Sequence, residues 1–209
     1  MSIERDSARF YLCGIATSEL KAAGCLGRRG ALRMGFAATL LLIARRARAD
    51  GDTPPENKRP QPGDQLVLLS GPNEGKLVRP EDLPLGGPQD QAYPKDPATG
   101  TVRNGSPLNL LVVARFDPAL FSEETAARAA EGVVAYSGVC THENCPVSMW
   151  KEEEKLLFCS CHGSEYDPRN SAAVVGGPAP RRLAALPVKL VDGIVTVAAP
   201  FTGGVGARR

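Results

Sequence analysis

The sequence predicts a mainly β protein, a small antiparallel barrel or sandwich with one short helix. Glycine (22 residues) and proline (18 residues) are abundant in the 209-residue chain, whereas aromatic residues make up only 5%. This mixture suits a loop-rich β domain better than a helical bundle. Several short apolar segments are separated by turn-forming residues, and only one segment has the signals of a helix. Many short strands with one helix are typical of small antiparallel architectures.

The strands are expected where short apolar runs are bounded by turn signals. The predicted strands are 65–70, 108–116, 133–139 and 155–161, followed by a hairpin over 188–201. Asp192-Gly193 provides the two-residue turn of this hairpin, which is the strongest short-range hairpin signal. The helix is expected over 122–132, with Ser122 as its N-cap and Gly132 as its stop. The region 80–107 is rich in proline and glycine, so we expect a long surface loop there.

The composition is that of a globular protein with one core. Apolar residues make up 43% and charged residues 23% of the chain, both ordinary values. The net charge is +2, and the arginines are scattered or lie in the N-terminal segment. This pattern gives no support for nucleic-acid binding, and we expect no nucleic-acid partner.

The first 49 residues resemble an export signal. An arginine pair at 28–29 precedes an apolar run over 34–44, and residues 47–49 (Ala-Arg-Ala) offer a cleavage site. The apolar run is well short of the roughly 20 residues that span a bilayer as a helix. The pair is similar to a twin-arginine signal, which exports proteins already folded around a cofactor. We expect residues 1–49 to be such a signal or a retained N-terminal anchor, and the protein to be periplasmic, with anchoring to the cytoplasmic membrane as the alternative.

The segment that follows is expected to connect the signal to a single domain. Residues 50–64 are proline-rich and charged and have no apolar period, which predicts a linker. The folded domain is then expected over 65–205, a length that can bury a stable core.

The metal-capable residues are concentrated in two short boxes, "CTHENC" (140–145) and "CSCHGS" (159–164). These boxes hold four of the six cysteines and both histidines of the chain. Each box follows a predicted strand, so both are expected to be loops at strand ends. The residues that could face a common point are Cys140, His142, Cys159 and His162. Such a set can hold zinc or an iron–sulfur cluster.

Together, the two boxes resemble the Rieske iron–sulfur family, in its disulfide-containing high-potential branch. That branch includes the Rieske subunits of cytochrome bc complexes and proteins like the arsenite oxidase small subunit. The resemblance covers residues 133–201 and implies a Rieske domain with a two-loop cluster-binding subdomain. It implies one [2Fe–2S] cluster per chain, with Cys140 and Cys159 on one iron and His142 and His162 on the other. It leaves none of these residues as a catalytic nucleophile.

The resemblance extends beyond the four ligands. It implies a disulfide between Cys145 and Cys161, which needs an oxidising compartment and so agrees with export. It implies that the hydroxyl groups of Ser164 and Tyr166 donate hydrogen bonds to cluster sulfurs, which stabilises the reduced form and raises the potential. The "GGPAP" segment (176–180) corresponds to the proline loop that covers the third side of the cluster.

The function implied is electron transfer within an oxidoreductase, rather than catalysis by this chain alone. The expected partners are a catalytic oxidoreductase subunit, a cytochrome or a quinol-oxidising complex, with quinol as a further candidate ligand. Quinol-oxidising members usually carry Leu-Gly where this chain has Glu143-Asn144. The polar pair alters the surface that docks at a quinol pocket and is expected to lower the potential.

We therefore favour an exported subunit or carrier of a periplasmic or respiratory oxidoreductase. The alternative is a cytochrome bc-type subunit with His162 at the quinol side. A soluble ferredoxin for a ring-hydroxylating oxygenase fits less well, because such ferredoxins lack the disulfide cysteines. A zinc-stapled binding module belongs to another class, which a visible absorption spectrum would distinguish.

Overall fold

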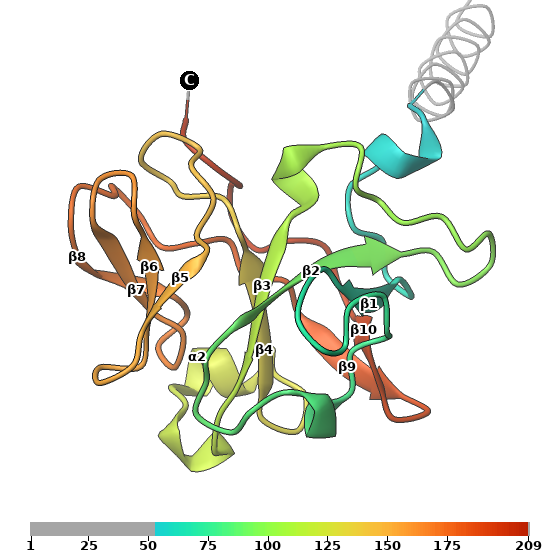
Figure 1. Cartoon of the computed structure of the whole chain (residues 1–209), viewed down its shortest axis with the longest axis horizontal. Coiled ribbons are helices and arrows are strands. Elements are labelled where there is room, and N and C mark those ends of the chain that lie inside the picture. The colour runs from blue at the N-terminus through green and yellow to red at the C-terminus, as the bar shows by residue number, and fades with distance from the viewer. Residues whose placement is uncertain (1–52, 209) are drawn as a thin grey trace, which may run out of the picture. The chain divides into compact units, whose positions relative to one another are not determined.

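The computed structural model describes residues 53–208, in which two antiparallel sheets lie side by side (Figure 1). The larger sheet has six strands in the order β4-β3-β2-β1-β10-β9. Its strands are β1 (Gln65–Leu68), β2 (Asp90–Lys95), β3 (Leu111–Arg115), β4 (Val133–Ser137), β9 (Val188–Val191) and β10 (Ile194–Val197). The predicted mainly β, antiparallel fold class is confirmed.

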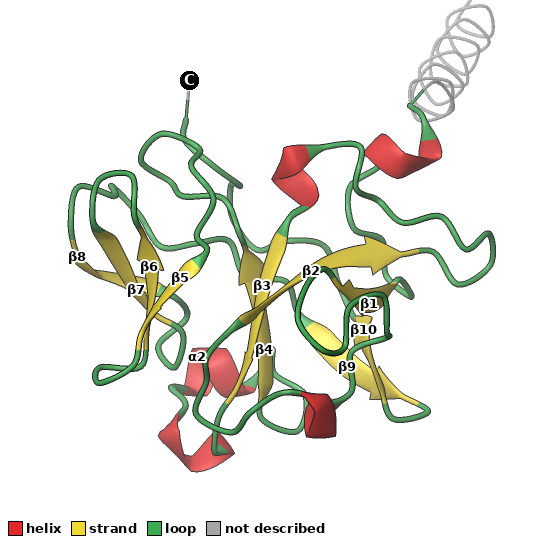
Figure 2. Cartoon of the chain, viewed as in Figure 1, coloured by secondary structure: helices red, strands yellow, loops and turns green. Residues whose placement is uncertain are grey.

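The smaller sheet is inserted in the sequence between β4 and β9. It has four strands in sequence order: β5 (Met149–Lys151), β6 (Leu156–Cys159), β7 (Ser164–Asp167) and β8 (Ala173–Gly176). Figure 2 shows the four strands as a separate yellow layer beside the larger sheet. The segment between β4 and β9 contains both cysteine–histidine boxes. It forms the two-loop subdomain expected from the sequence.

Two strands are shared by the two hydrophobic cores. Successive side chains of a strand point to opposite faces. Leu111 and Val113 of β3 therefore pack in the core of the larger sheet, while Val112 and Ala114 pack against the smaller one. Strand β4 alternates in the same way. Burial on both faces explains why these segments read as continuous apolar runs rather than alternating ones.

The predicted strands and hairpin are present, each with its ends trimmed. The segments 65–70, 108–116, 133–139 and 155–161 correspond to β1, β3, β4 and β6, and 188–201 contains β9 and β10. Asp192 and Gly193 have φ angles of 53° and 75°. Two positive φ angles in a two-residue loop match the turn expected there.

The prediction of a helix over 122–132 is wrong in length. The helix α2 covers only Glu123–Ala126, with Ser122 as its cap. The chain then turns back on itself, because Ala130 and Val133 form a β-bridge with each other. Pairing of this tight turn with the sheet overrides the helix propensity of the alanines.

The prediction of an unstructured loop over 80–107 is also wrong, because it contains β2. This strand lies between β1 and β3. Pro94 is the reason that the segment does not read as a central strand, since proline donates no hydrogen bond to a ladder. The β2–β3 pairing ends at Ala92 opposite Leu111, so Pro94 has no β3 residue to pair with.

The second half of the predicted linker is docked on the domain. Residues Pro55–Asn57 form a turn of 3-10 helix. Asp64 is buried and accepts two hydrogen bonds from Arg103, at 2.6 and 2.9 Å. The Nδ2 atom of the Asn109 side chain donates to the Lys58 carbonyl at 2.8 Å. The segment from 55 to 64 is therefore held by side chains some 40 to 50 residues further along the chain.

The predicted export segment, residues 1–49, lies outside the described residues. Within residues 53–208, we find no helix with the length and apolarity that crossing a bilayer requires.

Candidate metal centre

The first box forms a compact loop after β4. The Cys140 amide donates to the Cys145 carbonyl at 2.8 Å, and the Asn144 amide donates to the Cys140 carbonyl at 3.1 Å. Val139 and Pro146 form a β-bridge that closes the base of the loop. These backbone contacts fix the loop, so its side chains are held at one end of the subdomain.

The second box is the turn of the β6–β7 hairpin. Cys159 ends β6 and is paired with Ser164, which begins β7. The Gly163 amide donates to the Cys159 carbonyl at 3.0 Å and closes the turn between them. Cys161 and His162 therefore lie at the exposed tip of the hairpin.

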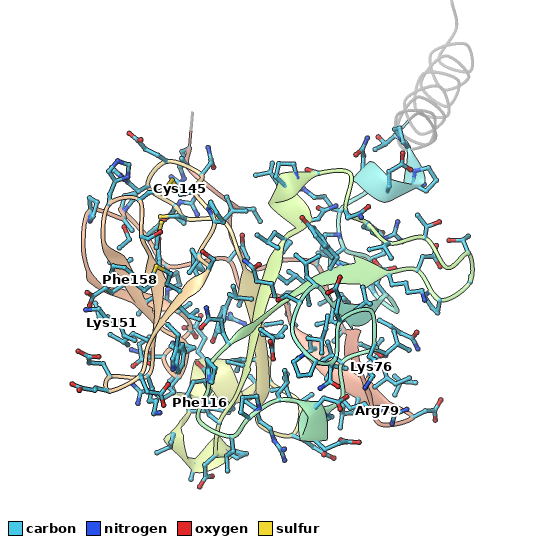
Figure 3. The ribbon with its side chains drawn as sticks, in the orientation of Figure 1. Lys76, Arg79, Phe116, Cys145, Lys151 and Phe158 are labelled. Carbon is cyan, nitrogen blue, oxygen red and sulfur yellow. A yellow bond between two sulfur atoms is a disulfide. The ribbon has the colours of Figure 1, made fainter. Side chains whose placement is uncertain are left out.

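A disulfide between Cys145 and Cys161 joins the two loops, as the resemblance implied, with a Cα–Cα distance of 6.5 Å. Figure 3 shows Cys145 at the loop end of the smaller sheet, with Phe158 and Lys151 further along its strands. The chain-entropy model gives about 3 kcal/mol for cross-linking a loop of this size. Cys140 and Cys159 are the free cysteines of the described residues, and both are buried.

The two histidines meet across the gap between the loops. Their Nδ1 atoms are 3.2 Å apart, and the rings are nearly perpendicular. Two nitrogens bound to one tetrahedral metal at the bond length of zinc sites, about 2.0–2.1 Å, lie about 3.3 Å apart. The pair is thus placed to share one metal ion. The Nε2 atom of His162 faces the other way, 4.0 Å from an oxygen of the exposed Glu143.

The two free thiols lie in a protected environment. Burial opposes ionisation of Cys140, but hydrogen bonds from Tyr166 and the neighbouring backbone outweigh it and lower its pKa. Burial, together with the hydrogen bond shared with Cys140, raises the pKa of Cys159. Metals bind the thiolate form of cysteine, so a thiol with a lowered pKa favours binding.

Two buried hydroxyl groups face this thiol pair. The Tyr166 hydroxyl lies 3.1 Å from the Cys140 sulfur, and burial followed by this contact raises the pKa of Tyr166 to about 12. It therefore keeps its proton at neutral pH. The Ser164 hydroxyl is fully buried and has no hydrogen-bond partner among the described residues. Buried hydroxyls nearly always have a partner, so the Ser164 hydroxyl fits a bound group that supplies an acceptor.

The proline loop lies against the second box. A Cβ atom added to Gly177 would come within 2.3 Å of the Gly163 carbonyl oxygen and 2.5 Å of the Ser164 Cα atom. This close approach requires glycine and places residues 176–180 beside the hairpin turn.

Sequence reasoning missed two residues that connect the first box to the proline loop. The Thr141 hydroxyl donates to the Arg181 carbonyl at 2.6 Å. The Thr141 amide also donates to the Tyr166 hydroxyl at 3.3 Å. Thr141 lies inside the first box, which was a signal available in the sequence, whereas nothing in the sequence marked Arg181.

Comparison with known proteins identifies the family. A family model described as the Rieske [2Fe–2S] domain matches residues 94–187. A cytochrome bc1 complex Rieske iron–sulfur subunit of Streptomyces lividans is 30% identical over 128 residues, which cover 60% of this chain and 75% of that protein. The chain belongs to the Rieske iron–sulfur family. As a Rieske domain, it binds a [2Fe–2S] cluster, and the cysteine and histidine groups that could hold it are present.

Other Rieske proteins share shorter segments with it. A Haloferax mediterranei protein, provisionally named the Rieske subunit of a respiratory nitrate reductase, is 46% identical over 76 residues, which are 36% of this chain and 34% of that protein. The aligned segments cover about a third to a half of the first curated relatives. The Synechocystis PCC 6803 plasma-membrane Rieske protein is 25% identical, over 49% of this chain and 89% of that chain, with a TM-score of 0.33.

The Tyr166 hydroxyl gives a prediction for the redox potential. Tyr166→Phe removes one donor to the Cys140 sulfur and leaves the ring packing in place. A donor to sulfur stabilises the more negative, reduced form, so its loss is expected to lower the midpoint potential. A difference of about 1 kcal/mol between the two redox states corresponds to roughly 40 mV for one electron. Potentiometric titration of both proteins measures the shift.

The matched control for this substitution is Tyr136→Phe. Tyr136 is a buried tyrosine of the same core, and its hydroxyl donates to the Pro168 carbonyl at 2.7 Å. Its loss is expected to lower the free energy of unfolding without changing the potential. Equal shifts in the two variants would contradict the assigned role of Tyr166.

Proposed function

We propose that this chain is an electron-transfer subunit or carrier whose cluster is held by Cys140 and Cys159 on one iron and by His142 and His162 on the other. The observation that supports this most strongly is the convergence of the two Nδ1 atoms at 3.2 Å, together with the buried free thiols of the same two boxes. When bound, a Rieske cluster takes up and releases one electron at about −150 to +300 mV.

The cysteine side and the histidine side of the proposed centre differ in their exposure to solvent. Cys140 and Cys159 are 1% exposed, which keeps the thiolate side of the centre away from water. His142 is partly exposed and His162 exposed, so the histidine side is where electrons would pass to and from a partner. No residue of this chain is proposed to act as a catalyst on a substrate.

The proposed assembly is a respiratory or periplasmic oxidoreductase in which another subunit carries out the chemistry. The names of the Haloferax and Streptomyces relatives, a respiratory nitrate reductase subunit and cytochrome bc1 subunits, support a respiratory complex. The first box carries exposed Glu143 and Asn144 beside the histidines. This polar tip suits a polar protein partner better than an apolar quinol pocket.

The second candidate is a quinol-oxidising subunit of a cytochrome bc-type complex. The names of the Streptomyces and Mycobacterium relatives favour it. In this case His162 would face the quinol, because it is the more exposed of the two histidines. Its Nε2 atom, turned toward Glu143, would be the site that accepts a proton.

Purification of the affinity-tagged full chain from the membranes of its own host tests the proposal. A catalytic oxidoreductase subunit with its own redox cofactor, in a stoichiometric complex, is the expected result. A complex containing b-type haem would instead support the quinol-oxidising candidate. A protein without cluster absorption would contradict the function proposed, whereas a cluster-containing protein that copurifies with no redox subunit after mild detergent extraction would favour a carrier over a subunit.

We propose further that residues 1–49 export the folded protein, with 50–64 leading into the domain, so that the cluster lies outside the cytoplasmic membrane. A cluster is assembled in the cytoplasm, whereas the Cys145–Cys161 disulfide favours an oxidising compartment. Export of the folded protein satisfies both requirements. Changing Arg28 and Arg29 together to lysine is expected to retain the holoprotein in the cytoplasm. Fractionation measures the distribution, and normal export of the variant would show that the twin-arginine interpretation is wrong.

A further inference from the structure

The C-terminal segment returns to the first cluster-binding box. Beyond β10, which ends at Val197, Thr202 forms an isolated bridge with Ala185, and its amide donates to the Ala185 carbonyl at 2.8 Å. In Figure 1 the dark red end of the chain rises beside the loop that follows β4. The Ala207 amide then donates to Oδ1 of Asn144 at 2.6 Å. Residues 202–207 therefore run from this bridge to Asn144 in the first box. We call this segment the strap.

Asn144 is an unusual residue for this position. Its φ angle is 62°, in the left-handed region that favours glycine and that asparagine also tolerates. It lies between His142 and Cys145, and its own amide closes the loop onto the Cys140 carbonyl. A change in the position of the Asn144 side chain therefore also shifts the backbone segment that carries His142 and Cys145.

Gly206 is the matching position on the strap. It is buried, with a φ angle of 66°. A Cβ atom at Gly206 would come within 2.2 Å of Asn144 Oδ1 and 3.3 Å of Val139 Cγ1. The strap approaches the loop so closely that a larger residue at position 206 would displace the Asn144 side chain.

Arg181 holds the strap from the other side. Its guanidinium donates to the Gly204 and Gly206 carbonyls, while its own carbonyl accepts from the Thr141 hydroxyl. Arg181 directly follows the proline loop, which covers the second box. Arg181 therefore connects the strap to the first box, through Thr141, and to the proline loop that covers the second box.

We propose that the strap positions the first cluster-binding loop, with Asn144 and Arg181 as its positioning residues. This inference rests on the proposed ligand assignment. The strap holds the loop tip through Asn144 Oδ1, so that His142 stays opposite His162. Loss of the strap contact lets the loop open and speeds loss of iron. Partners outside the ligand shell typically alter metal affinity 10–100-fold.

The test compares four full-length holoproteins with the wild type: Asn144→Gly, Gly206→Ala, the double variant of these two, and Gly100→Ala. Asn144→Gly keeps the left-handed backbone but removes the oxygen acceptor. Gly100→Ala is the matched control, because Gly100 lies outside the strap and also has a positive φ, 75°, with nothing within 4 Å of its added Cβ atom. The rate of loss of the visible cluster absorption in excess chelator is measured, together with the redox potential and the hydrogen exchange of amides 140–145.

Asn144→Gly and Gly206→Ala are each expected to speed cluster loss about 10-fold. The double variant is expected to lose its cluster about 10-fold, not 100-fold, faster, because both substitutions break the same contact. Amides 140–145 exchange faster in these three variants, and their redox potential shifts in one common direction. Gly100→Ala is expected to behave as the wild type.

Three results would overturn the proposal: unchanged cluster loss in both single variants, effects that multiply in the double variant, or an equal effect of Gly100→Ala. Each of them would leave the ligand assignment intact as long as the wild type holds its cluster. Failure of the ligand assignment has a different signature, because the wild type itself would then lack Rieske absorption.

Discussion

His142→Ala and His162→Ala are each expected to yield a folded protein without a [2Fe–2S] cluster. The Nδ1 atoms of the two rings converge at 3.2 Å, so removing either leaves one iron with an open position at an exposed tip. The thiols of Cys140 and Cys159 remain, but they would hold one side of the cluster alone. Visible absorption and iron content measure the loss, which is expected to be complete.

Glu143→Gln is the matched control for the histidine variants. Glu143 is exposed in the same loop, and its carboxylate lies 4.0 Å from the outward nitrogen of His162. It is therefore expected to affect the cluster only through its charge, with full iron content and a slightly raised potential. Cluster loss in Glu143→Gln, or an unchanged spectrum in either histidine variant, would contradict the ligand assignment.

Arg103→Leu is expected to lower the free energy of unfolding by about 3–5 kcal/mol, because it leaves Asp64 as a buried, unpaired charge. Arg103 is 4% and Asp64 2% exposed, and two hydrogen bonds join them. The same guanidinium donates to the Pro55 carbonyl at 3.1 Å. The substitution thus releases the segment before β1 as well as breaking the pair. Urea unfolding of the holoprotein measures the loss.

Lys151→Leu provides the comparison for the arginine variant. Lys151 of β5 and Glu165 of β7 form an ion pair at 2.5 Å, but their side chains are 35% and 23% exposed. Such exposed pairs contribute little, so the loss is expected to be much smaller than that of Arg103→Leu. Similar losses in the two variants would show that the Asp64–Arg103 pair is not the buried anchor described above.

The proposed ligands of the metal centre could be read from the sequence because their residues are local. Cys140 and His142, like Cys159 and His162, are separated by one or two residues, so each box carries its chemistry within a few positions. The hairpin turn at 192–193 was predictable for the same reason, since two adjacent residues determine it.

The errors arose where distant parts of the chain decide the structure. Strand β2 exists because β1 and β3 pair with its two edges, although Pro94 argues against a strand locally. The segment 55–64 reads as a linker because its partners, such as Arg103, are far away in sequence. In the sequence Asn144 stands out only as a polar residue of the first box. Its contact with Ala207 could not be predicted, because the two residues are 63 positions apart.

The most direct test of the central assignment is the EPR spectrum of the reduced protein as isolated, recorded with pulsed detection of nitrogen couplings. Two imidazoles on the reduced iron are expected to lower the average g value below that of an all-cysteine [2Fe–2S] cluster and to add couplings from two histidine nitrogens. Because His142 and His162 are the only histidines of the chain, both couplings would be assigned without further labelling. An average g value typical of all-cysteine ligation, with no nitrogen coupling, would contradict the assignment of Cys140, His142, Cys159 and His162.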